Sequence, residues 1–510
     1  MKYGLLTILL LSTVAAYTQR YEIKTLGIIK DQKNIPDLVR YGNRYYGIST
    51  SAKAKMGWTV NLEKMKSSNK LLAYDERVTL VKETVLENGN EVFGPFSSIL
   101  EIINDKLFFI SYRYSESTGI EIMAAEVDTV TVSLGEAKKI ITINQKNVGL
   151  FKIMDIIYSY NFVVRSSPDR SKYLFLWITG MNETFFFTVT DNKLNKLNSV
   201  TGSTEKTSDP TITNCFVDNA GNFFMGYKYK KKSTFHSGLV ASVNGVTKEA
   251  SLTLKEGLPH DVYVSAGTED DHVRVYGTYS IDGFYITGGF SCNLDKKNLS
   301  VKGLLQKPIP ETIMEKLDKD KYAKTKKKDY GAYPEVHFET SQLDKDVIIM
   351  AGDLTRYQSK GYGLDAVSLP VVGPTLILLI KKDDIIISRL PKKEELNQRA
   401  NNFFLHKWRT KAILLYADVE GNLDKPVEDA ETSDYSSRRN NVMVAALVEP
   451  DGKIIRKILH PDTPGSFYFS PSFVESIGDD TVMAGLGKDK IGLTSIRTTQ
   501  QFYLLKIIDE

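Results

Sequence analysis

Histidine is the side chain best suited to binding metals or moving protons near neutral pH, and the chain carries six of them. No two are closer than twelve residues in the sequence. Zinc sites built on one structural element carry His or Cys pairs about three to five residues apart, so this spacing indicates no such motif. A site assembled from several loops is the remaining alternative, and we expect no metal site. The six are His236, His260, His272, His337, His406 and His460.

Two acidic clusters, Glu269-Asp270-Asp271 and Asp383-Asp384, could supply oxygen ligands to calcium. Adjacent residues of a strand point to opposite faces, and neither cluster has the spaced acids and Gly of a dedicated calcium loop. We therefore interpret both as solvated turn acids. The sequence predicts no cofactor.

Enzymes that cleave glycosidic bonds need two carboxylates facing one pocket, and a sequence alone cannot show such a pair. Ser167-Pro168-Asp169 resembles the start of the sialidase Asp-box. Ser171 stands where that motif has Gly, and no Trp closes it. The chain also lacks a Gly-x-Ser-x-Gly elbow, which removes the simplest interpretation as a serine hydrolase.

Two polar segments are candidate binding surfaces. One is a long loop between Asp418 and Asn440 that combines a tyrosine with two arginines, the residue types common in binding hot spots. The other is a run of lysines that could dock an acidic surface. The alternative for both is an ordinary solvated insertion. The candidate residues are Tyr435, Arg438, Arg439, Lys326, Lys327 and Lys328.

These side chains would be positioned by a recurring unit, in which a polar turn, an apolar strand, a Gly/Ser/Asn turn and a second strand follow one another. The turn before the strongest strand carries Asp or Asn in seven units, and Arg409 lies near the one place without it. From Asp105 to Asp479 is 374 residues, or about 62 for each of six steps, which fits radially repeated sheets. The seven anchors are Asn43, Asp105, Asp169, Asp218, Asp270, Asp344 and Asp479.

The clearest unit runs from Asp218 to Leu254. Phe223 to Tyr229 is predicted as a buried strand, and Gly238 to Val243 as a second strand ending at the hairpin signal Asn244-Gly245. Val246 to Leu254 alternates polar and apolar residues, as a half-exposed outer strand does. Apolar inner strands and alternating outer strands are what a propeller blade requires.

The predicted fold is therefore all-β, a single β-propeller of about eight four-stranded blades, with seven as the alternative. Tyr21 to Ile29 and Phe502 to Ile508 are predicted strands, and a ring would pair them in the last blade. One short helical insertion is expected near residues 308–329. Val367 to Ile380 contains Pro370, Gly373 and Pro374, which favours two strands there.

Residues 1–16 are typical of a secretory signal peptide, which leaves 17–510 as the propeller domain. The apolar run from Leu5 to Leu11 is far shorter than the ~20 residues that span a bilayer. We therefore expect an exported protein, periplasmic or extracellular, that does not span the membrane. Cys215 and Cys292 are expected to be unbonded small hydrophobic side chains, with a disulfide as the alternative.

The net charge and the apolar fraction of the chain limit the classes of partner and of fold that it can have. The formal net charge is only +4, so the strong basic excess expected of a nucleic-acid-binding protein is missing. The apolar fraction of 42% is enough to build a large core, which excludes general disorder.

Four short segments carry a resemblance to a known group of proteins. The chain resembles the large exported β-propeller proteins of unknown function found in Bacteroidetes, and the resemblance covers about the C-terminal third. It implies a fold and an export route, and it brings no catalytic residues. The segments are Asp353-Leu354-Thr355-Arg356-Tyr357, Leu390-Pro391-Lys392-Lys393, Asp418 to Asn422 and Pro450-Asp451-Gly452-Lys453.

The sequence thus predicts an exported, monomeric, non-enzymatic binding or scaffold protein. Its ligand, an unknown protein, peptide or glycan, would meet one propeller face or the mouth of the central channel. One alternative is a carbohydrate-active enzyme or glycan-binding protein with an axial pocket. Another is a periplasmic sensor or structural component of the cell envelope.

Overall fold

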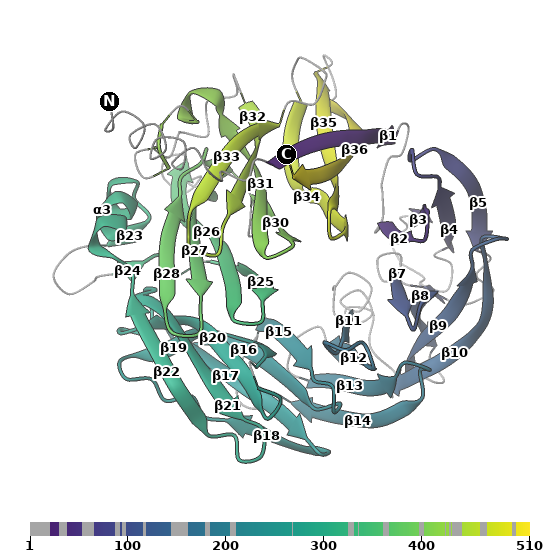
Figure 1. Ribbon diagram of the computed structural model, residues 1–510, viewed down its shortest axis with the longest axis horizontal. Helices are drawn as coiled ribbons and strands as arrows, with labels where there is room; N and C mark the ends of the chain where they lie inside the picture. Colours follow the sequence, from purple (N-terminus) through teal and green to yellow (C-terminus); the bar gives the residue numbers. More distant parts are fainter. Residues whose placement is uncertain are drawn as a thin grey trace, which may run out of the picture.

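Eight antiparallel sheets of four principal strands are arranged around one axis in the described part of the chain (Figure 1). The predicted all-β propeller is therefore confirmed, with eight blades. The computed structural model describes residues 21–29, 38–53, 66–86, 92–93, 98–115, 119–143, 162–178, 184–203, 211–267, 269–324, 331–334, 336–360, 367–396, 402–423, 425–427, 430, 441–459, 467–491 and 496–509.

The first four blades follow the chain in order, each from its inner to its outer strand. Blade 1 consists of β2 (Leu38–Tyr41), β3 (Arg44–Lys53), β4 (Lys66–Tyr74) and β5 (Leu80–Leu86). Blade 2 consists of β7 (Ile99–Ile103), β8 (Lys106–Ser115), β9 (Gly119–Asp128) and β10 (Ser133–Ile143), and the short β6 (Val92–Phe93) also pairs with β8. Blade 3 consists of β11 (Phe162–Ser166), β12 (Lys172–Ile178), β13 (Thr184–Asp191) and β14 (Lys196–Ser203). Blade 4 consists of β15 (Thr211–Val217), β16 (Phe223–Lys231), β17 (Thr234–Val243) and β18 (Val246–Ala250).

The next three blades repeat this order. Blade 5 consists of β19 (Leu258–Ala266), β20 (His272–Ser280), β21 (Gly288–Asp295) and β22 (Val301–Pro308). Blade 6 consists of β25 (Phe338–Asp344), β26 (Val347–Lys360), β27 (Val367–Ile380) and β28 (Ile385–Leu390), and the short β29 (Glu395–Leu396) also pairs with β27. Blade 7 consists of β30 (Phe403–Trp408), β31 (Lys411–Val419), β32 (Asn441–Val448) and β33 (Ile454–Leu459). A short 3-10 helix, η3 (Glu420–Asn422), follows β31.

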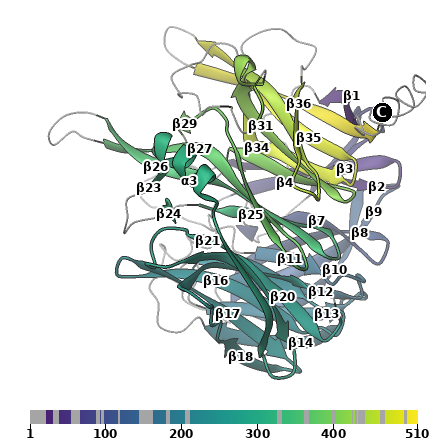
Figure 2. The same ribbon diagram turned by 60° about the vertical axis from the view of Figure 1, so that its left-hand side comes forward.

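Blade 8 is built from both ends of the chain. Its strands are β34 (Phe467–Gly478), β35 (Thr481–Ile491), β36 (Ile496–Asp509) and β1 (Tyr21–Ile29). The antiparallel register of β1 on β36 runs from Tyr21 opposite Asp509 to Ile29 opposite Phe502. The prediction that N- and C-terminal strands share the last blade is confirmed, and their pairing closes the ring (Figures 1 and 2).

The polar anchors occupy equivalent places in the eight blades. Each lies at the connection between the first and second strands, from Asn43 in blade 1 to Asp479 in blade 8, and Arg409 fills the place in blade 7. Asp218 shows why an acid suits this position. Its Oδ1 accepts hydrogen bonds from the backbone N–H groups of Ala220 and Asn222, at 3.0 and 2.8 Å, and so holds the turn.

The second strand of each blade is buried on both of its faces. In β12, Tyr173, Phe175 and Trp177 pack in a cluster with blade 2. The alternate residues Leu174, Leu176 and Ile178 pack in a cluster with blade 4. Eight such clusters occur in the described part of the chain, one at each junction between neighbouring blades. This two-sided burial explains why these strands are continuous apolar runs.

The prediction of two strands over Val367 to Ile380 is wrong. β27 is one strand that pairs with β26 from Lys360–Val367 to Ile348–Ile380. Asp353 is opposite Thr375 and Thr355 is opposite Val372, so Gly373 and Pro374 lie together against one residue of β26. The two residues form a bulge, where the ladder of backbone hydrogen bonds is already interrupted. Pro374, which has no N–H group, is therefore tolerated there, and the strand continues.

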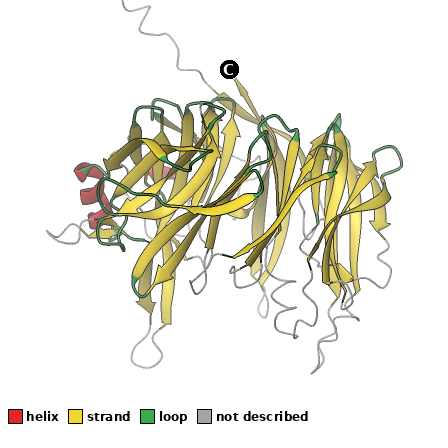
Figure 3. Ribbon diagram, turned by 90° about the horizontal axis from the view of Figure 1, so that it is seen from below, coloured by secondary structure: helices red, strands yellow, loops and turns green. Residues whose placement is uncertain are grey.

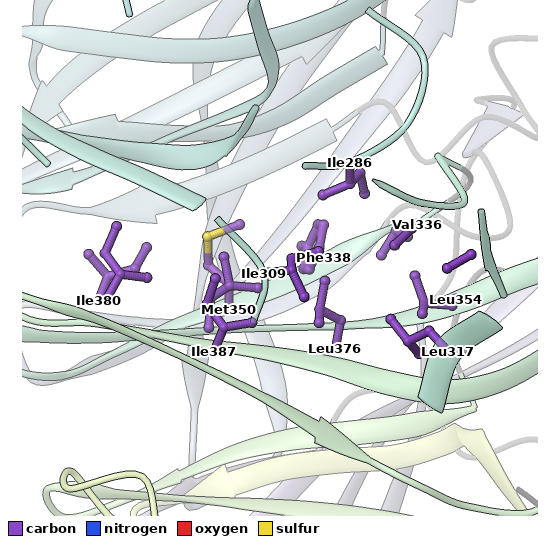
Figure 4. Close-up of a cluster of buried hydrophobic side chains, with 14 of the residues drawn as sticks. Ile286, Ile309, Leu317, Val336, Phe338, Met350, Leu354, Leu376, Ile380 and Ile387 are labelled. Atoms are coloured by element: carbon purple, nitrogen blue, oxygen red, sulfur yellow. The ribbon is translucent and has the colours of Figure 1, made fainter. Parts of the chain in front are cut away.

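The predicted helical insertion is present as α3 (Glu311–Lys319), at the periphery of the ring between blades 5 and 6 (Figure 3). It is not simply a solvated insertion. Met314 and Leu317 are fully buried in the same cluster as Phe338 and Leu354 of blade 6 (Figure 4). The chain then forms β23 (Ala323–Lys324) and β24 (Gly331–Ala332), a two-stranded sheet outside the blades.

Both cysteines are free, as expected. Cys292 is buried and Cys215 half-buried, and burial raises the thiol pKa of Cys215 to about 11 and that of Cys292 to about 12. Among the described residues, no helix combines the length and apolar character needed to cross a membrane.

The packing between blades predicts a large cost for truncating a middle-strand residue. Phe175 has no exposed surface, so Phe175→Ala should lower the free energy of unfolding by about 3 to 5 kcal/mol. Val130 is 83% exposed, and Val130→Ala should change the free energy of unfolding by less than about 0.5 kcal/mol. Urea unfolding followed by circular dichroism measures both. Equal effects of the two substitutions would contradict this packing.

Candidate functional site

A cavity of about 410 Å³ lies at the ends of the inner strands of blades 3 to 6, on the face that carries the turns between first and second strands. It is lined by β11 and its following turn, β15, β19 and β25, with one residue from β20. This size falls in the range of small-molecule sites in proteins, roughly 300 to 1,000 Å³. Hydroxyl groups come from Ser166, Ser167, Ser265, Thr340 and Ser341, amides from Asn214 and Gln342, rings from Phe216 and Tyr276, and a guanidinium from Arg170.

Asn214 joins the two inner strands β15 and β19 in the wall of the cavity. Its Nδ2 donates to the carbonyl of Val264 at 2.8 Å, and its Oδ1 accepts from the Val264 N–H at 2.9 Å. The neighbouring Thr213 hydroxyl donates to the carbonyl of Val262. The amide of Asn214 thus serves to hold β15 against β19, and the hydroxyl groups nearby are better placed for a ligand.

Tyr276 forms part of the wall and is rigidly held. Its ring stacks on Tyr263 with centroids 5.9 Å apart, and the Tyr263 hydroxyl donates to the carbonyl of Phe338 at 3.2 Å. Burial raises the pKa of Tyr276 to about 12, so its hydroxyl remains protonated at neutral pH. The side chain of Thr340 is its hydrogen-bond partner.

Arg170 is the one charged residue among the described residues that line the cavity. It is exposed, and its backbone has φ 57° in the turn after β11, where its N–H donates to the Ser167 carbonyl at 2.9 Å. The positive charge of Arg170 acts on the carboxyl group of Glu101 on β7. Burial raises the pKa of Glu101, and the positive charges of Arg165 and Arg170 oppose that rise. A cavity whose charge comes from an arginine favours an anionic group in its ligand.

The described lining contains no carboxylate. A glycoside hydrolase needs two of them, about 5 to 9.5 Å apart, around the bond it cleaves. The cavity therefore offers hydrogen bonding, ring contact and one positive charge. These are the components of a binding site.

The candidate binding residues from the sequence, Tyr435, Arg438, Arg439 and Lys326 to Lys328, all lie outside the described residues. The cavity was missed by sequence reasoning because its lining comes from four blades. The Asp-box-like segment did mark one part of it. There the Ser167 hydroxyl is 2.6 Å from Asp169 Oδ1, which also accepts from the Ser171 N–H at 2.9 Å.

The acidic clusters already have neighbouring side chains as partners. Glu269, Asp271 and His272 bring their potential ligand atoms within 4.8 Å of one another. However, His272 Nδ1 is already 2.5 Å from Asp271 Oδ1, and Lys302 Nζ is 3.4 Å from His272 Nε2. In the other cluster, Asp384 pairs with Lys307 at 2.7 Å. Both arrangements fit solvated ion networks of the surface.

A buried ionic group that sequence reasoning missed joins blades 4 and 5. Asp261 accepts from Lys228 Nζ at 2.9 Å and from the Thr278 hydroxyl at 2.7 Å, and lies 2.7 Å from His260 Nδ1. Burial alone would raise the pKa of Asp261, but the positive charge of Lys228 and the contact with His260 lower it well below its usual range. Burial lowers the pKa of His260, which favours its neutral form. The adjacent pair His260-Asp261 in the sequence was the available signal.

Three of the four segments that carried the family resemblance form one polar cluster in blades 6 and 7. Buried Asp353 pairs with buried Lys392 and accepts from the N–H of Asn402 at 2.6 Å. Two residues further along, Glu394 pairs with Arg356 at 2.9 Å. These contacts fasten the chain after β28 to β26, beside the bulge of β27, so the segments contribute to the packing of the blade. Asp418 and Asn422 belong to the same cluster. The carboxylate of Asp418 accepts hydrogen bonds from the Lys393 N–H and from the side-chain amide of Asn422.

Comparison with known proteins identifies no family for the chain. No family model and no curated protein matches the chain. Among solved structures, the β-propeller domain of the Trilobed protease from Pyrococcus furiosus shares 12% identity over 84% of this chain and 95% of that one, with a TM-score of 0.37. The Dos1 propeller shares 8% over 96% and 95%, with a TM-score of 0.40. A protein of unknown function from Dyadobacter fermentans DSM 18053 shares 9% over 69% and 96%, with a TM-score of 0.31. The chain is thus distantly similar to varied propellers.

The raised pKa of Asp418 predicts that the free energy of unfolding depends on pH. Burial raises its pKa from an ordinary 3.8 to about 6, so the folded state binds the proton more tightly than the unfolded state. The stabilisation from this proton is complete below about pH 4 and is lost as pH rises through 6.

The free energy of unfolding of the native protein, compared with that of Asp418→Asn, should therefore fall by about 2 kcal/mol between pH 4 and pH 7. Urea unfolding at a series of pH values measures the difference. A difference that stays constant over this interval would show that Asp418 does not titrate as described.

Proposed function

We propose that this protein is a non-enzymatic binding protein whose channel mouth holds a polar ligand bearing a carboxylate or another anionic group. The observation that carries the proposal is the cavity of about 410 Å³ in which Arg170 is the charged residue of the described lining. Its volume admits a small molecule or the end of a longer chain.

The chemistry of the lining supports this class of ligand. A guanidinium can donate two parallel hydrogen bonds to one carboxylate, which gives both affinity and orientation. The hydroxyl groups of Ser265 and Ser341 are suited to the remaining polar groups of a ligand, and Phe216 offers an aromatic surface. An acidic oligosaccharide fits this combination, because a sugar ring presents hydroxyls, an apolar face and a carboxylate.

The described lining lacks the carboxylate pair of a glycosidase, and we therefore propose binding and not cleavage. Export to the periplasm or cell exterior belongs to the same proposal and rests on the signal-like residues 1–16. So does a relation to the exported propellers of Bacteroidetes, which rests on the four C-terminal segments.

The proposal predicts that removing the positive charge of Arg170 weakens anion binding. Arg170→Asn deletes the charge while keeping a residue type that tolerates positive φ, so the turn should be preserved. We expect the dissociation constant for an acidic ligand to rise by about 10- to 100-fold, the effect of losing charge-assisted hydrogen bonds. Arg409→Asn is the matched control, since Arg409 also has positive φ, at 55°, in the equivalent turn of blade 7.

Ligands are first sought by thermal shift with glucuronate-containing oligosaccharides, neutral oligosaccharides of the same length, and acidic peptides. Isothermal titration calorimetry then compares the native protein with both variants. The absence of binding to every acidic compound would contradict the proposal. Equal losses in the Arg170 and Arg409 variants would show that the effect does not arise in the cavity.

A further inference from the structure

Three connections at one end of blades 4 and 5 meet in a continuous surface. They are the turn between β16 and β17, the segment between β18 and β19, and the loop between β20 and β21, and Figure 1 shows these strands in neighbouring blades. The Phe235 N–H donates to the Gly283 carbonyl at 2.7 Å. A Cβ added at Gly283 would overlap the methyl group of Thr234 and would lie 3.8 Å from Leu258. Gly283, with φ +75°, is thus the point where the three connections touch.

Lysines dominate the charge of this surface. Lys230, Lys231 and Lys232 are consecutive and exposed, and none of them has an ion pair with a described residue. Lys230 Nζ lies 5.1 Å from the ring centroid of Phe235, and Lys228 Nζ lies 4.6 Å from it. A cation held over an aromatic ring keeps its positive charge, so Lys230 remains open to an anion on its other side, whereas Lys228 is already paired with Asp261.

The acids nearby do not neutralise these lysines. The Asp282 carboxylate accepts from the Ser280 hydroxyl at 2.8 Å and from the N–H groups of Phe284 and Tyr285 at 2.8 and 2.9 Å. It is therefore committed to its own loop. Glu256 and the adjacent Lys255 are both exposed, so the formal charges of this segment sum to zero.

Large apolar side chains are exposed beside the lysines. Ile281 is 61% exposed and Leu258 is 42% exposed. The half-buried rings of Phe235 and Phe284 lie next to them, with centroids 6.0 Å apart. Lysines combined with exposed aliphatic and aromatic residues are the composition by which proteins bind at a membrane interface.

We propose that this lysine-aromatic surface, made of Lys230, Lys231, Lys232, Phe235, Leu258, Ile281 and Phe284, binds the surface of an anionic lipid bilayer. The lysines contact anionic headgroups, and Ile281 and Leu258 enter the boundary of the acyl chains. A bilayer is favoured over an acidic protein because both aliphatic side chains sit on connections at the same end of adjacent blades, where one flat surface reaches them together.

The surface and the cavity lie at opposite ends of the blades. Leu258 begins β19 and Ala266, which lines the cavity, ends it, and nine residues of strand span roughly 30 Å. A protein bound in this way would hold the mouth of its cavity away from the bilayer. The inference is independent of the proposed ligand, because it rests on different residues.

Sedimentation with vesicles tests the proposal on the full chain. The protein should bind vesicles of phosphatidylcholine with 30% phosphatidylglycerol and should not bind pure phosphatidylcholine, in a buffer of low ionic strength. Replacing Lys230 and Lys231 by Gln and Lys232 by Asn should weaken binding on the order of 10- to 100-fold, and added salt should weaken it further. The matched control is Gln at the exposed Lys193, Lys297 and Lys345, which lie in turns at the other end of the blades.

The aliphatic residues separate a bilayer from a soluble polyanion. The pair Ile281→Ser and Leu258→Ser should weaken vesicle binding while leaving binding to polyglutamate unchanged, and thermal unfolding shows whether each variant is folded. Binding to anionic vesicles that depends on both the lysines and this pair supports the proposal. No binding to anionic vesicles, equal binding to pure phosphatidylcholine, or binding that ignores the aliphatic pair would overturn it.

Discussion

Each middle strand buries one face against the blade before it and the other against the blade after it, and the rest of the structure depends on this constraint. Phe187 of blade 3 and Phe223 of blade 4 meet across one junction with ring centroids 4.2 Å apart. A blade alone would leave an apolar face in water, so each blade needs two neighbours. The first and last blades can meet this need only by packing on each other, as Tyr45 and Leu504 do in the cluster between blades 1 and 8.

Ring closure also decides where function can lie. The middle strands are filled by packing, and the inner strands end together on one face, where their side chains and turns form a cavity. The opposite end carries the connections with the exposed lysines and aliphatic residues. The cavity at one end combines the arginine Arg170 with hydroxyl groups, and the surface at the other end combines lysines with apolar side chains.

The architecture could be predicted from the sequence because its signals are local. An acid that holds a turn, as Asp218 does, and a strand apolar on both faces, as β12 is, each repeat within a few residues. The pairing of β1 with β36 followed from the edges that a ring must remove. The bulge at Gly373 and Pro374 was missed, since proline alone indicates an interruption and the partner strand decides whether pairing continues.

The candidate site could not be predicted, because its residues are brought together by contacts between blades. Asn214 bonds to Val264, fifty positions away in the sequence, and Ser167 shares the cavity with Gln342 of blade 6. Apart from the Asp-box-like segment at Ser167, nothing local marks such neighbours. The buried pair of Asp353 and Lys392 has the same character, for each residue alone would be predicted at the surface.

The closure of the ring is tested most directly by a disulfide between its two ends. Lys24 and Lys506 are register partners in β1 and β36, and paired strands hold their Cα atoms about 4.5 to 5.5 Å apart, within reach of a disulfide. In a background with Cys215→Ala and Cys292→Ala, oxidation of Lys24→Cys with Lys506→Cys should give an intramolecular bond in most monomers. Lys24→Cys with Lys82→Cys, which places the second cysteine on β5 of blade 1, should not. Crosslinking of the first pair that is no more efficient than that of the second would contradict a ring closed by the N-terminal strand.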